Sequence, residues 1–178
     1  MNLPNKLTTA RMALVPVLVV LMLSGAGGPA NRWICLAIFV GASLTDWLDG
    51  YLARKNNLVT NYGKLMDPLA DKLLVCSALV CLVGTGKLPA WFVVIIIARE
   101  FIISGFRLIA AEKGTVIAAN YWGKVKTVTQ MILIGLLLGD VRALDPLTKI
   151  AMVLTVALTI ISLATYIWQN RGVMSEQD

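Results

Sequence analysis

Hydrophobic residues in this 178-residue chain gather into six long stretches, and the chain divides between them at Gly, Pro and charged residues. Each stretch approaches the ~20 apolar residues that a helix needs to cross a bilayer. The connections are too short to hold a second domain. The pattern predicts one all-α polytopic membrane domain over residues 1–178, with a short N-terminal interfacial segment and six transmembrane helices at about 7–24, 32–53, 67–83, 89–111, 121–138 and 146–168.

The first stretch could also be a signal peptide, because Lys6 and Arg11 precede an apolar run that ends in small residues at 24–27. Residues 4–6 are more typical of an interfacial start to a helix that is retained. Trp and Tyr residues near the ends of other spans fit the same interface. We therefore expect this segment to remain as the first span.

Six spans place both termini on one side of the membrane, and the basic residues divide unevenly between the two sides. The positive-inside rule makes the richer side cytoplasmic, so we expect cytoplasmic termini. That side would hold Lys6, Arg11, Arg54, Lys55, Lys64, Lys72, Arg107, Lys113, Lys124, Lys126 and Arg171, and the opposite side Arg32, Lys87, Arg142 and Lys149.

The amino-acid composition of the chain limits the kinds of protein and of chemistry that are possible. The chain is 58% hydrophobic and 15% charged, unlike a soluble domain. It has no histidine, which excludes imidazole as base, nucleophile or metal ligand. Cys35, Cys76 and Cys81 lie in apolar runs without a C-x-x-C pair, which indicates helix packing. The net charge of +6 favours a membrane surface and an anionic substrate over nucleic acid, because the basic residues interrupt apolar segments.

Four carboxylates occupy positions where a membrane helix rarely tolerates charge. Asp46 and Asp49 lie three residues apart near the end of the second span, and Asp67 and Asp71 lie four apart at the start of the third. Each pair therefore shares a helical face. A short loop joins these helices as an antiparallel pair, so all four carboxylates can meet near the cytoplasmic interface.

Such a cluster needs cations, because the carboxylates would otherwise repel one another. Oxygen ligands suit two divalent ions, Mg²⁺ or Mn²⁺, which can clamp a phosphoryl group between them. Gly50 and Gly63 would leave room beside the carboxylates for a substrate. The alternative is a set of solvated acids at helix ends, with Asp67 and Pro68 marking the start of a helix.

Residues 46–71 follow the pattern D-x-x-D-G-x-x-A-R-x8-G-x3-D-x3-D. This pattern resembles the signature of the CDP-alcohol phosphotransferases, and every fixed position is present. The six-span length of the chain also resembles this family.

The resemblance implies a direct, in-line attack of an alcohol on the β-phosphorus of CDP-diacylglycerol, with release of CMP. Two metal ions would be held by Asp46, Asp49, Asp67 and Asp71, and Asp71 would also be the base. The CDP moiety would be bound by Asp46, Asp49, Gly50, Arg54, Gly63 and Asp67. The resemblance further implies a homodimer in a bacterial plasma membrane, with the active site open to the cytoplasm.

Basic residues in the fourth and fifth stretches are candidates for binding the phosphate of the acceptor, since Arg suits bidentate phosphate contacts. Arg99 and Arg107 lie eight residues apart and so share a face, whereas Glu100 is expected on another. Lys124 and Lys126 open the next helix, although ordinary positive-inside anchoring would also explain these two. Arg99 lies too deep in its span for easy snorkelling.

Segments at 2–11, 97–107 and 123–127 also resemble the bacterial phosphatidylglycerophosphate synthase branch of the family, whose acceptor is glycerol 3-phosphate. In the first segment, Asn5, Thr8 and Arg11 are candidates for lining the substrate cavity. Inositol 1-phosphate would also need a basic pocket, so charge alone leaves it open as the acceptor.

Two other classes of membrane protein fit this pattern of acids less well. An ion or proton transporter would spread its acids across the membrane, but these cluster at one end of the second and third spans. A silent membrane scaffold would have no use for four acids there. The spacing of Gly135 and Gly139 permits a close helix contact, which could be a dimer contact, and is also frequent by chance.

Overall fold

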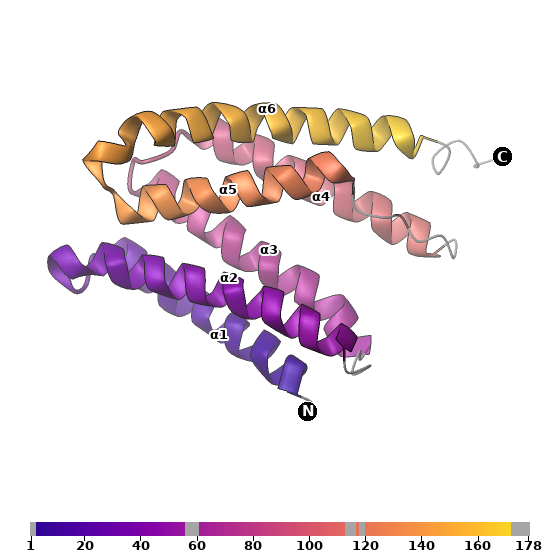
Figure 1. Cartoon of the computed structure of the whole chain (residues 1–178), viewed down its shortest axis with the longest axis horizontal. Coiled ribbons are helices and arrows are strands. Elements are labelled where there is room, and N and C mark those ends of the chain that lie inside the picture. Colours follow the sequence, from indigo (N-terminus) through magenta and orange to yellow (C-terminus); the bar gives the residue numbers. More distant parts are fainter. Residues whose placement is uncertain (1–2, 56–60, 113–116, 118–119, 172–178) are drawn as a thin grey trace. The chain divides into compact units, whose positions relative to one another are not determined.

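The computed structural model describes residues 3–55, 61–112, 117 and 120–171, and these residues form six α-helices (Figure 1). They are α1 (Leu3–Ser24), α2 (Asn31–Lys55), α3 (Asn61–Gly84), α4 (Ala90–Glu112), α5 (Tyr121–Gly139) and α6 (Asp145–Gln169). Short 3-10 turns, η1 (Gly28–Ala30) and η2 (Arg142–Leu144), precede α2 and α6. The all-α prediction with six helices is confirmed.

Two helices begin earlier than the sequence pattern predicts. Helix α1 already starts at Leu3, so the expected separate N-terminal segment is instead its first turn. Pro4 fits there because the first N–H groups of a helix have no intrahelical partner. Helix α3 starts at Asn61, so Asp67 and Pro68 do not mark its beginning. The reading of these two residues as a helix start is therefore wrong.

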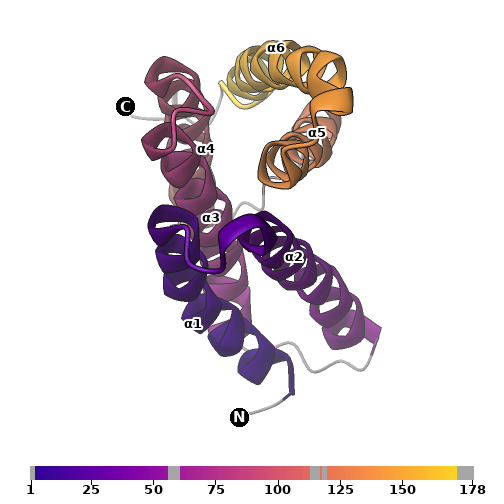
Figure 2. The ribbon, with the colours of Figure 1, turned by 90° about the vertical axis from the view of Figure 1, so that its left-hand side faces the viewer.

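The chain divides into two compact units, Met1–Leu88 with Ile134–Asp140, and Pro89–Leu133 with Val141–Asp178. In the first unit α1 packs against both α2 and α3 (Figure 2). Helices α2 and α3 also touch, and they run in opposite directions (Figure 1). The buried side chains recur at helical spacing and include Val15, Leu18, Met22, Phe39, Ala42, Leu74, Ala78 and Leu82.

The C-terminal end of α5 belongs to this first unit and is capped by cations from elsewhere in it. Asp140 ends the helix in the left-handed conformation, with φ of 49°. Lys87 Nζ donates to the Leu137 carbonyl at 2.9 Å and pairs with the Asp140 carboxylate at 3.0 Å. Arg32 Nη1 donates to the Asp140 carbonyl at 3.3 Å. These contacts satisfy carbonyls that the helix itself leaves unpaired.

Gly135 and Gly139 contact α2 of the same chain. A Cβ atom at either position would lie 3.7 Å from a methyl group of Leu36. The glycine spacing therefore serves helix packing within the first unit.

In the second unit α4 packs against α6, whose buried face is polar. Its buried residues are Ala151, Thr155, Thr159, Ser162 and Tyr166. Large apolar side chains such as Val153, Ile160 and Trp168 are exposed instead. This arrangement is the reverse of a helix on the surface of a soluble protein, and it suits lipid on the outside.

Residues 142–169 form a segment that is long and apolar enough to cross a membrane, the one such segment in the part of the chain that the structure describes. Helix α1 holds a shorter apolar run, Thr8–Ser24. Helix α4 is of similar length to α6 but carries Arg99, Glu100 and Arg107. That all six helices cross the membrane, and that residues 1–178 form one domain, stay predictions.

We expect Lys87→Met to lower the thermal unfolding midpoint of the detergent-solubilised protein. The change keeps the apolar stem of Lys87 but removes its bonds to the end of α5, at a cost of about 1 kcal/mol. For a chain of this size that corresponds to a decrease of about 2–4 °C. Lys149→Met, at an exposed position of α6, is the control and should leave the midpoint unchanged. Equal midpoints in the two variants would mean that the Lys87 contacts contribute nothing.

Candidate active site

The backbone of the first unit carries the four predicted metal-binding residues on two helices that run in opposite directions. Asp46 and Asp49 lie in the last three turns of α2, and Asp67 and Asp71 lie in the first three turns of α3. Because both helices are continuous there, each pair does share a helical face. The Asp71 side chain is half-buried. The side chains of Asp46, Asp49, Arg54 and Asp67, and the surroundings of Gly50 and Gly63, lie outside what the structure describes.

The N-terminal candidates lie on the first turns of α1. Thr8 and Arg11 are buried, and the Arg11 Nε donates to the Ala42 carbonyl at 3.2 Å. Ala42 lies one helical turn before Asp46 on α2, so Arg11 contacts α2 next to the predicted metal-binding pair. The Asn5 side chain is outside the part that the structure describes.

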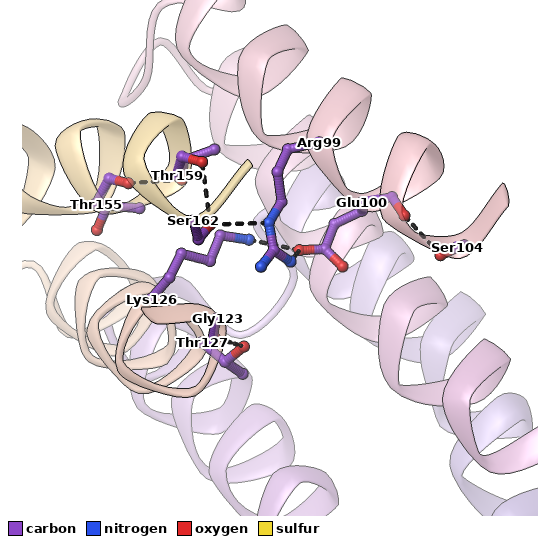
Figure 3. Close-up of polar contacts among 9 residues, drawn as sticks. All are labelled: Arg99, Glu100, Ser104, Gly123, Lys126, Thr127, Thr155, Thr159 and Ser162. Carbon is purple, nitrogen blue, oxygen red and sulfur yellow. Dashed lines mark hydrogen bonds and ion pairs between the residues drawn. The ribbon is translucent and has the colours of Figure 1, made fainter. Parts of the chain in front are cut away.

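A second cluster of charged side chains lies among α4, α5 and α6 of the other unit (Figure 3). Glu100 Oε1 accepts from Arg99 Nη1 at 2.8 Å and from Lys126 Nζ at 2.6 Å. Arg99 Nε donates to Ser162 Oγ on α6 at 3.1 Å. Arg99 and Lys126 are only 7% and 1% exposed, so both cations are held inside this unit.

Ser162 is held in place for this contact by its own helix. Its hydroxyl donates to the Thr159 carbonyl at 3.0 Å, which leaves the oxygen to accept from Arg99 (Figure 3). The Thr155 and Thr159 hydroxyls donate in the same way to carbonyls one turn earlier. These three residues of α6 thus satisfy their own hydroxyl donors, and Ser162 offers an acceptor to Arg99.

The first turn of α5 is fastened to α6 by Asn120. Its side-chain oxygen accepts from the Trp122 backbone N–H at 3.0 Å, which makes Asn120 the N-cap of α5. Its side-chain nitrogen donates to Thr165 Oγ1 on α6 at 2.9 Å. These bonds fix the start of α5, and Lys126, one turn after Trp122, bonds to Glu100 from this fixed part of the helix.

The cluster carries more positive than negative charge. Arg99 and Lys126 contribute two positive charges and Glu100 one negative charge, which leaves the three groups together with one positive charge. Charge interactions are stronger in buried surroundings than in water, because the effective dielectric constant is lower. The cluster is therefore suited to attract an anion such as a phosphate monoester.

The other two predicted phosphate-binding residues are exposed and are not buried with this cluster. The Arg107 guanidinium lies 5.9 Å from the ring centre of Tyr166 on α6 and is itself exposed. Arg99 and Arg107 do share a face, since both contact α6. Lys124 is exposed on α5.

The expectation that Glu100 faces away from Arg99 is wrong. Adjacent residues leave a helix about 100° apart, but the three torsions of a Glu side chain allow its carboxylate to swing back. Lys126 of the neighbouring helix draws the carboxylate to the same place. The direction of Glu100 therefore depends on a partner 26 residues away.

Sequence reasoning missed Ser162 and Asn120. A signal for Ser162 is present, because the polar residues Thr155, Thr159, Ser162 and Tyr166 recur every three or four positions within an apolar helix. For Asn120 the signal is its place directly before the fifth apolar stretch, a usual N-cap position.

The chain is similar to known proteins over most of its length. Residues 1–161 match the family described as CDP-alcohol phosphatidyltransferase. A Bacillus subtilis protein named CDP-diacylglycerol--glycerol-3-phosphate 3-phosphatidyltransferase is 43% identical over 95% of each chain. A Rickettsia bellii protein of the same name is 37% identical over 93% of each chain. A probable phosphatidylglycerophosphate synthase of Mycobacterium tuberculosis is 38% identical over 93% of this chain and 80% of its own. With a match over most of its length and relatives of this similarity, the chain belongs to the CDP-alcohol phosphatidyltransferase family.

Proposed function

We propose that this protein transfers the phosphatidyl group of CDP-diacylglycerol to glycerol 3-phosphate, giving phosphatidylglycerophosphate and CMP. The observation that carries the proposal is the 43% identity, over 95% of both chains, to a relative that is named for this reaction. The complete signature over residues 46–71 and the net positive cluster around Arg99 support it.

The donor set on α2 and α3 suits a pair of hard divalent cations, Mg²⁺ or Mn²⁺, since it consists of carboxylate oxygens on two helix faces. The residues that would hold the ions are Asp46, Asp49, Asp67 and Asp71. When bound, such ions neutralise the diphosphate and make CMP a better leaving group. Gly50 and Gly63 leave space for the cytidine, and Arg54 offers its guanidinium to the diphosphate.

The chemical step is a single displacement at phosphorus. The Asp71 carboxylate takes the proton of an acceptor hydroxyl, and the hydroxyl oxygen bonds to the β-phosphorus of CDP-diacylglycerol. The bond from this phosphorus to the bridging oxygen breaks, and CMP leaves with that oxygen and its electron pair. The phosphatidyl group and the acceptor oxygen are then joined in a phosphodiester, and no covalent enzyme intermediate forms.

The phosphate of the acceptor is bound by Arg99 and Lys126, with Arg107 and Lys124 contributing from exposed positions. A dianionic phosphate gains most from a buried group of net positive charge. An alcohol without net charge, such as serine or myo-inositol, brings no net negative charge to match it. The charge supports a phosphorylated acceptor, and the named relatives favour glycerol 3-phosphate over inositol 1-phosphate.

The setting is a bacterial plasma membrane that all six helices cross, with both termini and the active site in the cytoplasm. The apolar outer face of α6 and the excess of basic residues on the side of the termini support this arrangement. The protein works as a homodimer surrounded by membrane lipids, as the family resemblance implies.

The first test is CMP release by the purified protein with CDP-diacylglycerol and Mg²⁺. Glycerol 3-phosphate should stimulate release, whereas serine and myo-inositol should not, because only a phosphorylated acceptor matches the basic cluster. CMP release with inositol 1-phosphate alone would support the proposed reaction type but would refute glycerol 3-phosphate as the acceptor. No release with any acceptor would favour a transporter.

Asp71→Asn should lower kcat for CMP release by at least about a hundredfold, since the amide cannot accept the hydroxyl proton. Asp145→Asn serves as the matched control, because Asp145 is an exposed residue in the first turn of α6. It should leave kcat unchanged. A fully active Asp71→Asn protein would remove Asp71 from the mechanism.

Lys126→Gln should raise the KM for glycerol 3-phosphate about tenfold or more through loss of one charged contact, with the KM for CDP-diacylglycerol unchanged. Lys124→Gln changes an exposed lysine two residues away and should have the smaller effect. Thermal melts of both variants would show that they fold. Equal effects on the acceptor KM would contradict the assignment of Lys126 over Lys124.

A further inference from the structure

We propose that Gly123 is a positioning residue, whose missing side chain gives the Arg99 guanidinium the place from which it binds the acceptor phosphate. The proposal rests on the proposed function and deepens it. Gly123 lies in the first turn of α5, directly beside Arg99 (Figure 3).

The space between the two residues is too small for any side chain. A Cβ atom at position 123 would lie 2.9 Å from Arg99 Nη2, closer than real Cβ contacts allow. Contact of this kind can be relieved when the neighbour is the end of a mobile side chain. Arg99 is not mobile in this sense, since it is 7% exposed and its guanidinium is bonded at two other nitrogens.

The two bonds fix the plane of the guanidinium. Nε donates to Ser162 Oγ at 3.1 Å and Nη1 donates to Glu100 Oε1 at 2.8 Å. Because the group is planar and rigid, Nη2 cannot move away from α5 unless one of these bonds lengthens. Ser162 is itself tied to the Thr159 carbonyl, so it cannot follow.

Helix α5 is held on the other side of the contact. Asn120 caps its first turn and bonds to Thr165 of α6 at 2.9 Å. Lys126 bonds to Glu100 at 2.6 Å. Both Arg99 and the first turn of α5 are therefore fastened to the same two helices, α4 and α6, and a methyl group between them displaces Arg99 from its partners.

Among the helical glycines whose surroundings the structure describes, this tightness is particular to position 123. A Cβ at Gly105 in α4 would meet nothing within 4 Å. A Cβ at Gly135, further along α5, would meet a Leu36 methyl at 3.7 Å, which is ordinary contact. These two positions provide matched control variants, because Ala favours a helix over Gly at all three.

The test compares steady-state kinetics of the full-length protein carrying Gly123→Ala, Gly105→Ala or Gly135→Ala. Gly123→Ala should raise the KM for glycerol 3-phosphate about tenfold, the worth of one charged hydrogen bond, with the KM for CDP-diacylglycerol unchanged. The two controls should leave both constants unchanged. An unchanged acceptor KM in Gly123→Ala, or equal rises in both substrates' KM, would overturn the proposal.

A double-mutant cycle separates a clash with Arg99 from a general effect on the helix. Arg99→Lys removes Nη2, so Gly123→Ala should have almost no further effect on the acceptor KM in that background. The same fold-change in both backgrounds would overturn the proposal. If Gly123→Ala alone does not fold, folding of the double variant would support the clash, and its failure to fold would refute it.

Failure of this inference is distinguishable from failure of the proposed function. A wild-type protein that releases no CMP with glycerol 3-phosphate would refute the function. A wild-type protein that does so, with Gly123→Ala kinetics like those of the controls, would refute the inference alone.

Discussion

Charged groups inside an apolar helical protein need polar partners within the protein, and the second unit is organised around this constraint. Removing an ion from water costs several kcal/mol even after relaxation, so each buried charge needs partners that repay it. A single oxygen atom of Glu100 pairs with both Arg99 and Lys126. The Ser162 hydroxyl oxygen accepts a further hydrogen bond from Arg99 Nε. The three helices are consequently held together by polar groups on the inside, while large apolar side chains lie on the outside.

Features that look unrelated in the sequence follow from the same requirement. Thr155, Thr159 and Ser162 of α6 supply polar surface to the interior without adding charge, and each of these three hydroxyls donates to a carbonyl of its own helix. Asn120 fixes the start of α5 and thereby the position from which Lys126 contacts Glu100. In the first unit Arg11 and Lys87 likewise direct their charge to backbone carbonyls, at Ala42 and Leu137.

Under the proposed function, these two sets of residues have different roles. The carboxylates of α2 and α3 would serve the diphosphate of the donor, and the cluster on α4 and α5 would serve the phosphate of the acceptor alcohol. The positive charges of this cluster are already held in place by Glu100 and Ser162. Little further ordering of these side chains would therefore be needed for a phosphate to bind.

The amino-acid sequence by itself determined the number of helices, most of their bounds and the residues of the signature, because apolar run length and residue spacing are local properties. It misjudged the starts of α1 and α3, since Pro4 and Pro68 were read as boundaries although helix α1 includes the first and α3 the second. The tertiary structure alone decided that Glu100 turns toward Arg99, that Ser162 accepts from Arg99 and that Gly123 lies directly against the Arg99 guanidinium. Each of these depends on a contact between residues 24 to 63 positions apart, and no local pattern records which residues a fold brings into contact.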